Sequence, residues 1–218
     1  MGAKAKRDKH KDELRREILN AARALCINEG YEKFSMRKLA GKIGYSPTTI
    51  YFYFRDKDDL LFAICEEVAE HFFAHLSTIR KAYGNPLESL RQALLCLIEF
   101  GFNNPNEFRV LFLKGHEVYG TLDAFMEKES MARHSYFVFR EIVSDCIVGG
   151  ELQEIDIDVL TQALTLAAHG LVALTVYEVI FPWVDRNILA HTLVEGLLRG
   201  FGKRFFSNAN DRCFAGVL

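Results

Sequence analysis

Groups that can bind another molecule are concentrated between positions 48 and 57. They are four hydroxyls and one amine, carried by Thr48, Thr49, Tyr51, Tyr53 and Lys57. Ile50 and Phe54 are four residues apart, so in a helix they share one face and are expected to pack inward. Hydroxyls and an ammonium group on the other faces are suited to hydrogen bonds with phosphate oxygens and base edges. This chemistry predicts a short helix that contacts a nucleic acid.

The residues before this segment predict another short helix and a tight turn. The expected apolar face of that helix consists of Met36, Leu39, Ala40 and Ile43. Ser35 is suited to cap its start, and Gly44 is expected to end it. Ser46 followed by Pro47 predicts the start of the next helix, because the hydroxyl can accept an unpaired amide and proline is tolerated at the first helical position. Two short helices joined by a turn are typical of a helix-turn-helix that places its second helix in the major groove.

The run from Ile50 to Leu60 extends this interpretation. It reads Ile-Tyr-Phe-Tyr-Phe-Arg-Asp-Lys-Asp-Asp-Leu and is similar to the pattern Leu-Tyr-x-His/Tyr-Phe-x-x-Lys-x-x-Leu. The segment from Gly30 to Leu61 therefore resembles the DNA-binding domain of the TetR family of transcriptional regulators. The resemblance implies an all-α fold of about nine helices, with an N-terminal three-helix DNA-binding domain and a larger helical domain for effector binding and dimerisation. The alternative is that these aromatic residues only pack a small helical domain.

The resemblance also implies which residues contact DNA. They are Ser35, Arg37, Ser46, Pro47, Thr48, Thr49, Tyr51, Phe52, Tyr53 and Lys57. The two threonines are expected at base edges or phosphates, and the tyrosines and the lysine at phosphates. Pro47 and Phe52 depart from residues common in the family. Because residues 46 to 54 contain no Lys or Arg, sequence recognition is expected to depend on hydroxyls and shape. Affinity is expected to come from Arg37, Lys38, Lys42, Arg55, Lys57 and the basic residues 1–11.

Charge is distributed unevenly along the 218 residues, although the net charge is only −2. Residues 1 to 60 contain 14 Lys and Arg against 9 Asp and Glu, which gives +5; the remainder contains 13 against 20, which gives −7. This predicts a basic N-terminal head, which binds a polyanion, and an acidic body, which does not. The five cysteines include no C-x-x-C pair, which indicates reduced thiols and a cytoplasmic location.

The expected organisation is a basic flexible arm (1–11), a helix-turn-helix domain (12–55), an effector-binding and dimerisation domain (56–206) and a tail (207–218). Helices are expected at 12–28, 36–43, 47–54, 56–81, 86–102, 105–114, 122–148, 157–180 and 185–206. Residues 159 to 177 carry no charge and are long enough to span a membrane, but Gln162 and His169 favour a helix buried on both sides. No membrane contact is expected. A homodimer is expected through residues 157–181 and 185–206, where small side chains permit close helix packing.

Aromatic residues are frequent in the body, and the resemblance implies an effector cavity among them. The expected effector contacts are Phe72, Glu99, Phe100, Phe112, His116, His134, Phe137 and His169. For each histidine, a hydrogen-bonded structural role is the alternative. His71 and His75 have a spacing that could bind a metal, but nothing nearby completes a site, so no metal and no cofactor are expected.

These features predict a ligand-responsive transcriptional regulator. We expect a repressor that binds a palindromic DNA operator as a dimer and is released by a small, largely apolar effector. No catalytic residue is expected, because the glycine-rich phosphate-binding, zinc-binding and nucleophile-elbow motifs are absent from the sequence. The alternative is a helical small-molecule-binding protein or enzyme with a vestigial DNA-binding head.

Overall fold

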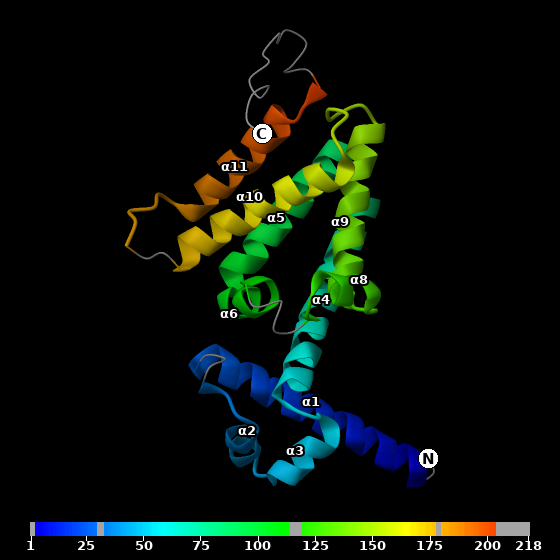
Figure 1. Cartoon of the computed structure of the whole chain (residues 1–218), viewed down its shortest axis with the longest axis vertical. Coiled ribbons are helices and arrows are strands. Elements are labelled where there is room, and N and C mark those ends of the chain that lie inside the picture. The colour runs from blue at the N-terminus through cyan, green and yellow to red at the C-terminus, as the bar shows by residue number, and fades with distance from the viewer. Residues whose placement is uncertain (1–2, 30–32, 114–118, 178–179, 204–218) are drawn as a thin grey trace. The chain divides into compact units, whose positions relative to one another are not determined.

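The all-α prediction is confirmed. The structure, a computed structural model, describes residues 3–29, 33–113, 119–177 and 180–203, and within them it contains ten α-helices, one π-helical segment and an isolated β-bridge between Leu152 and Gly202 (Figure 1). The elements are α1 (Ala3–Glu29), α2 (Met36–Ile43), α3 (Pro47–Tyr53), α4 (Lys57–Ala82), α5 (Pro86–Asn103), α6 (Pro105–Phe108), η2 (Arg109–Leu113), α8 (Leu122–Glu127), α9 (Met131–Val148), α10 (Ile157–Tyr177) and α11 (Arg186–Gly200). The expected tail, 207–218, lies outside the described residues.

The chain forms two compact units. Unit 1 comprises Met1–Ala74 and Asn103–Ser135, and unit 2 comprises His75–Phe102 and Tyr136–Leu218. Two helices, α4 and α9, therefore contribute residues to both units. The expected domains 12–55 and 56–206 meet at the start of α4, whereas the compact units divide this helix after Ala74.

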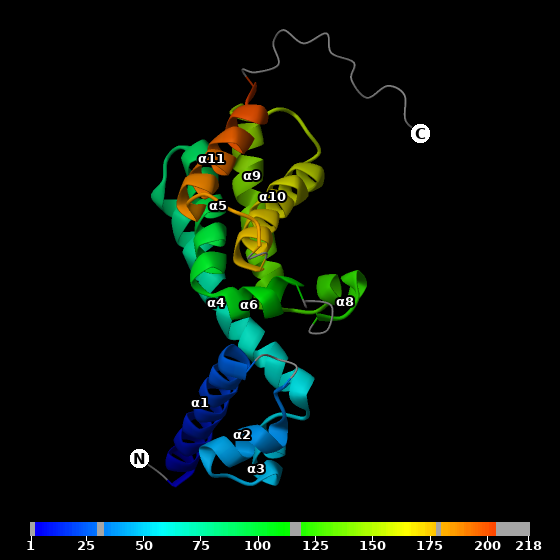
Figure 2. The same cartoon turned by 90° about the vertical axis from the view of Figure 1, so that its left-hand side faces the viewer.

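Unit 1 is built around the packing of α1, α2, α3 and the first turns of α4 (Figure 2). Its largest fully buried side chains include Ile18, Leu19, Leu39, Ile50 and Leu60. These apolar residues come from all four helices, so each short helix is held mainly by burying one face against the others.

Helix α1 begins at Ala3, nine residues before the predicted start at Asp12. The expectation of a flexible arm is therefore wrong for residues 3–11, which are helical. The local sequence explains this, because it contains no Gly or Pro between these positions and is rich in Ala, Lys and Arg, which favour helices. Lys9 and Glu13 add an i,i+4 ion pair of 3.8 Å between Nζ and Oε1.

The single helix predicted for residues 122–148 is also wrong, because α8 ends at Glu127 and α9 begins at Met131. Ser130 caps the new helix by accepting the Arg133 N–H on its Oγ at 3.2 Å. The Met131 N–H is accepted by Glu66 Oε2 at 2.7 Å. A serine and a distant carboxylate thus satisfy amides that a helix start leaves unpaired.

Two other predicted ends are corrected. The helix predicted for 105–114 is a short α-helix followed by the π-helical segment η2. The helix predicted for 185–206 ends at Gly200, and residues 204–206 lie outside the described part of the chain.

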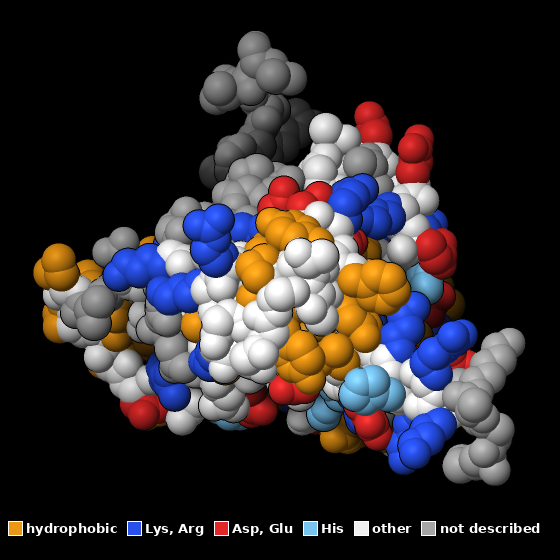
Figure 3. All heavy atoms as spheres, turned by 90° about the horizontal axis from the view of Figure 1, so that it is seen from below, with side chains coloured by type: hydrophobic (Ala, Val, Ile, Leu, Met, Phe, Trp, Pro, Cys, Tyr) orange, Lys and Arg blue, Asp and Glu red, His pale blue; other side chains and the backbone are white. Residues whose placement is uncertain are grey.

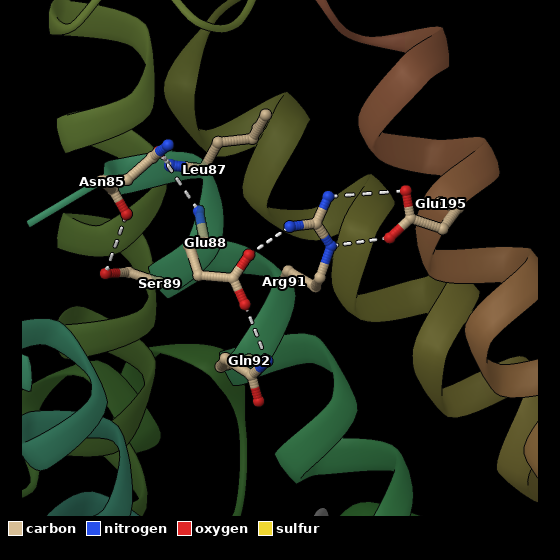
Figure 4. A network of polar contacts seen from close by, with 7 residues as sticks. All are labelled: Asn85, Leu87, Glu88, Ser89, Arg91, Gln92 and Glu195. Atoms are coloured by element: carbon tan, nitrogen blue, oxygen red, sulfur yellow. Dashed lines mark hydrogen bonds and ion pairs between the residues drawn. The ribbon is translucent and has the colours of Figure 1, made fainter. Parts of the chain in front are cut away.

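Unit 2 combines the end of α4 with α5, most of α9, α10 and α11, and its fully buried residues include Leu90, Leu94, Ile98, Ile142 and Leu160. Ion pairs join its helices at the surface. Arg91 of α5 contacts Glu88 on its own helix and donates from Nε to Glu195 Oε1 of α11 at 2.6 Å (Figure 4). Arg140 of α9 donates to Asp158 Oδ1 of α10 at the same distance of 2.6 Å.

Helix α10 is long and apolar enough, by length and composition alone, to cross a membrane. Only 28% of its most apolar window is buried in the single chain. The prediction of a helix buried on both sides is therefore wrong for one copy: Leu164 and Val172 face inward, whereas Leu166 and Leu174 are exposed.

Candidate nucleic-acid interface

The starts of α2 and α3 are fixed by the serines that the sequence indicates. Ser35 Oγ accepts the Lys38 N–H at 3.2 Å, and Ser46 Oγ accepts the Thr49 N–H at 3.1 Å. The Ser46 and Thr49 hydroxyls also lie 2.9 Å apart within hydrogen-bonding distance. Gly44 between the helices has a φ of +73°, a left-handed conformation that favours glycine. Both predicted boundaries of the helix-turn-helix are thus confirmed by cap geometry.

Helix α3 separates its side chains as predicted. Ile50 and Phe54 are 0% and 2% exposed and belong to the core of unit 1. On the outer side, Tyr51 is 52% and Phe52 is 75% exposed, and Pro47 and Thr48 are exposed as well. We call Thr48, Tyr51 and Phe52 the α3 face. Large aromatic side chains this exposed on a small domain indicate a surface that meets a partner.

Tyr53 is half-buried and occupies a different position from Tyr51. Its ring contacts Phe52 edge-on with 5.5 Å between centroids, and it also packs against the core. The phenol of Tyr51 is therefore the more accessible of the two predicted phosphate contacts.

A cation of α1 contacts this uncharged surface, and cations of α2 and α4 lie on the same compact unit. Lys11 Nζ of α1 lies 5.7 Å from the Phe52 ring centroid, and Lys57 Nζ of α4 lies 5.9 Å from the Phe34 ring. Arg37 of α2 is exposed. Figure 3 shows hydrophobic side chains gathered on this face with Lys and Arg side chains around them. Cations therefore border aromatic and hydroxyl groups, as a DNA-binding surface requires.

The sequence predicts that the cations of residues 1–11 add to DNA affinity, but it did not reveal that α1 contacts the α3 segment. Both Lys11 and Arg15 lie over rings of the α3 segment, since the guanidinium carbon of Arg15 is 5.1 Å from the Phe54 ring centroid. The helical character of residues 3–11 could have revealed this, because an uninterrupted helix places positions 7, 11, 14 and 18 on one side.

The start of α4 is secured by two aspartates. Asp56 Oδ1 accepts the Asp59 N–H at 2.8 Å, and Asp59 Oδ2 accepts the Arg55 N–H at 2.9 Å. The bond from the Asp59 amide, followed by that from the Arg55 side chain, lowers the pKa of Asp56. Arg55 donates from Nε to Asp56 at 2.9 Å, so part of its charge is used within the protein. This fixed helix start positions Lys57.

The predicted effector contacts are divided between the two units. Phe72, Phe112 and His134 belong to unit 1, Glu99, Phe100, Phe137 and His169 belong to unit 2, and His116 lies outside the described residues.

Several of these side chains have structural neighbours of their own. His134 lies 2.6 Å from Glu129 through Nε2, and Phe112 packs on Phe108 with 4.9 Å between ring centroids. Glu99 is exposed. His169 is largely buried, and this burial lowers its pKa to about 4.

Unit 1 contains a small apolar cavity of about 20 Å³, which none of the predicted effector contacts lines. It is enclosed by Arg23, Cys26, Leu61, Ile64, Cys65, Val68, Asn106, Glu107 and Leu111. Burial raises the pKa of the Cys26 thiol to about 11 and that of Cys65 to about 12, so both are protonated and poorly nucleophilic at neutral pH. Among the described residues, no group of three or more His, Cys, Asp and Glu side chains could hold a metal ion.

The helix-turn-helix is also the part of the chain that matches a known family. The sequence pattern of "Bacterial regulatory proteins, tetR family" matches residues 18–64, which include α2, α3 and the first turns of α4. An HTH-type transcriptional regulator of Staphylococcus aureus strain USA300 is 30% identical over 92 residues, which are 42% of this chain and 50% of that protein. This chain thus spans about half the length of the curated relatives that it matches.

Solved structures share the fold of this chain. A TetR/AcrR-family regulator from Thermobifida fusca aligns with a TM-score of 0.67 and 21% identity, over 86% of this chain and 98% of that one. The transcriptional regulator FadR from Bacillus subtilis, solved in complex with stearoyl-CoA, aligns with a TM-score of 0.69 and 20% identity, over 84% and 97%.

Proposed function

We propose that this protein is a transcriptional regulator that binds duplex DNA through α3 and releases it when a small effector binds. The observation that carries the proposal is the α3 face, where an exposed phenol, a threonine hydroxyl and a phenyl ring lie together and Lys11 of α1 contacts the phenyl ring. In the major groove, hydroxyls and methyl groups contact base edges, and cations outside it contact phosphates.

The proposed roles follow from accessibility. Thr48 and Phe52 contact bases, and Tyr51, Arg37 and Lys57 contact phosphates. The helix starts are held by Ser35, Ser46 and Thr49, which are proposed to lie next to the flanking sugar-phosphate backbone of the DNA. Pro47 and Tyr53 shape the same surface.

We propose that the protein acts as a homodimer through α10 and α11. Their exposed apolar residues are Val159, Leu166, Leu174 and Ile188, which we call the dimer face. Val159, Leu166 and Leu174 share one side of α10 with the small residues Ala163 and Gly170, because all are separated by three, four or seven positions or their sums. A second copy that covers this side would bury an uncharged surface and pair two heads on a two-fold operator.

The effector is proposed to be small and largely apolar, with the seven described contacts predicted above as its candidates. Support comes from the aromatic content of the body and from FadR, a structural neighbour that binds stearoyl-CoA. Helix α4 contributes residues to both units. An effector that shifts the C-terminal half of α4 therefore changes the fraction of molecules whose DNA-binding domains fit an operator. Repression, with release on effector binding, is the proposed outcome.

Selection of bound duplexes from a random DNA pool tests this function. The wild-type protein should enrich a palindrome whose half-sites are centred roughly 10 base pairs, or a multiple of this spacing, apart. The matched control is the double variant Tyr51→Ala and Lys57→Ala, which removes two proposed phosphate contacts outside the core and should enrich nothing. Enrichment of the same sequence by both proteins would refute the assigned contacts, and no enrichment by either would refute DNA binding.

A further inference from the structure

The first turns of α1 extend beyond the core of unit 1. Leu14 is the first buried residue of this helix, and residues 5–13 are all exposed. At 1.5 Å per residue, the helix projects roughly 16 Å from Leu14 back to its first residue. Residues 5–13 of this helix thus contribute no side chain to the buried core.

In residues 5–13, two cations lie on the same side of α1 that packs into the core of unit 1 from Leu14 onward. Positions 7, 11, 14 and 18 are separated by four, three and four residues, so Arg7 and Lys11 share a side with the buried Leu14 and Ile18. The contact between Lys11 and the exposed Phe52 ring confirms that this side turns toward the end of α3. The apolar stripe thus becomes cationic where it passes the edge of the core.

Arg7 and Lys11 are available for an anion. Among the described residues neither forms an ion pair, whereas Lys9, on the opposite side, pairs with Glu13. A groove of about 430 Å³ between α1 and α3 is lined by Asp8, Lys11, Asp12, Arg15, Phe52 and Tyr53. The two aspartates balance Lys11 and Arg15 in this groove, so phosphates are expected along the side of the helix that Arg7 and Lys11 share and not inside the groove.

We propose that residues 3–13 of α1 are a second DNA-binding element, in which Arg7 and Lys11 bind phosphates that flank the sequence contacted by α3. This inference rests on the proposed function, because α3 must first hold the duplex. It also accounts for a recognition helix without Lys or Arg: the neighbouring helix supplies the cations. Each phosphate that a protein neutralises releases counterions and makes affinity more dependent on salt.

The test measures how the dissociation constant depends on salt for three variants of the full chain. Arg7→Gln with Lys11→Gln removes the proposed phosphate-binding cations, and Lys6→Gln with Lys9→Gln removes the same charge from the other sides of the helix. Arg7→Lys with Lys11→Arg keeps the charge. The probe is a duplex enriched by the wild-type protein that extends beyond the selected sequence on both sides.

A plot of log affinity against log salt has a negative slope. The first variant should make this slope less negative by about 0.9 for each phosphate that it no longer neutralises, or by up to about 1.8 per protomer. The second and third should keep the wild-type slope. Shortening the duplex to the selected sequence should reduce wild-type affinity and leave the first variant little changed. Circular dichroism should show equal helicity in all four proteins, so that weaker phosphate binding is distinguished from unfolding of the helix.

Equal slopes for the Arg7/Lys11 and Lys6/Lys9 variants would overturn the inference while leaving the proposed function intact. Failure of the wild-type protein to bind any duplex would instead refute the proposed function.

Discussion

The α3 face and the dimer face both expose large apolar side chains, but their surroundings differ. Phe52 is 75% exposed and Leu166 is 71% exposed, so exposure alone does not distinguish them. Around Phe52 lie hydroxyls, a phenol and the ammonium of Lys11. Around Leu166 the helix carries no charge from Val159 to Tyr177. Under the proposed function, the neighbours of an exposed apolar residue indicate its partner: a polyanion for α3, and another apolar surface for α10.

The largest expected effect comes from placing charge on the dimer face. Leu166→Glu with Leu174→Glu should convert the dimer to a monomer, because carboxylates buried without partners cost several kcal/mol. The mass measured by analytical ultracentrifugation checks this. Val148→Glu is the matched control, since Val148 is 84% exposed and lies on neither α10 nor α11. A double variant that stays dimeric would show that the apolar side of α10 has no part in assembly.

The second prediction concerns His169 of α10. Burial lowers the pKa of this histidine from an ordinary 6.5 to about 4. The unfolded chain therefore binds a proton that the folded chain does not, and the stability associated with neutral His169 is complete above pH 6.5 and lost progressively as the pH falls toward 4. The loss is about 3 kcal/mol for a shift of this size.

Urea unfolding at several pH values checks this prediction. His169→Gln has no titrating group at this position and should lose less stability than the wild type over the same range. Parallel pH profiles for the two proteins would contradict a buried neutral histidine.

Removing the cap of α3 should have a smaller effect. Ser46→Ala removes the side-chain acceptor of the Thr49 N–H, which then keeps only the Ser46 carbonyl at 3.0 Å, and should lower the free energy of unfolding by about 1 kcal/mol. DNA affinity should fall with it, because the α3 face exists only when this seven-residue helix is formed. Ser46→Gly is expected to cost a few tenths of a kcal/mol. Equal stability of the alanine and glycine variants would indicate that the core, and not the cap, determines the start of α3.

The smallest effect is expected for the ion pair that joins α5 to α11. Arg91 and Glu195 are 28% and 40% exposed, so water screens the pair and a double-mutant cycle with Arg91→Ala and Glu195→Ala should give a coupling of about 0.2–1 kcal/mol. High salt should reduce this coupling, whereas it should leave the dimer face unaffected. A coupling that does not change with salt would mean that the two side chains act through packing.

The part of the fold that the sequence could predict is the part that local chemistry determines. Ser35, Gly44 and Ser46 act within a few residues of themselves, and both helices of the helix-turn-helix have the predicted bounds to within one residue. The break before α9 could not be predicted, because it depends on Glu66, which is 65 residues away in sequence from Met131. Long-range contacts of this kind are invisible to periodicity.

The candidate site shows the same limit. The exposure of Tyr51 and Phe52 follows from the inward positions of Ile50 and Phe54, so the sequence predicts it. The approach of Lys11 to Phe52 joins residues 41 positions apart and needed the structure. The contact of His134 with Glu129 shows the same limit, because Glu129 lies in the break between α8 and α9, and residues five positions apart in the predicted continuous helix would not share a face.

One experiment tests the assignment of different partners to the two faces most directly. The mass and the duplex-bound fraction of three proteins would be measured together by analytical ultracentrifugation: the wild type, the Tyr51→Ala and Lys57→Ala variant, and the Leu166→Glu and Leu174→Glu variant. The first altered protein should remain a dimer and bind no duplex, and the second should be a monomer with weakened binding. A Tyr51 and Lys57 variant that binds the duplex like the wild type, or that becomes a monomer, would contradict the account.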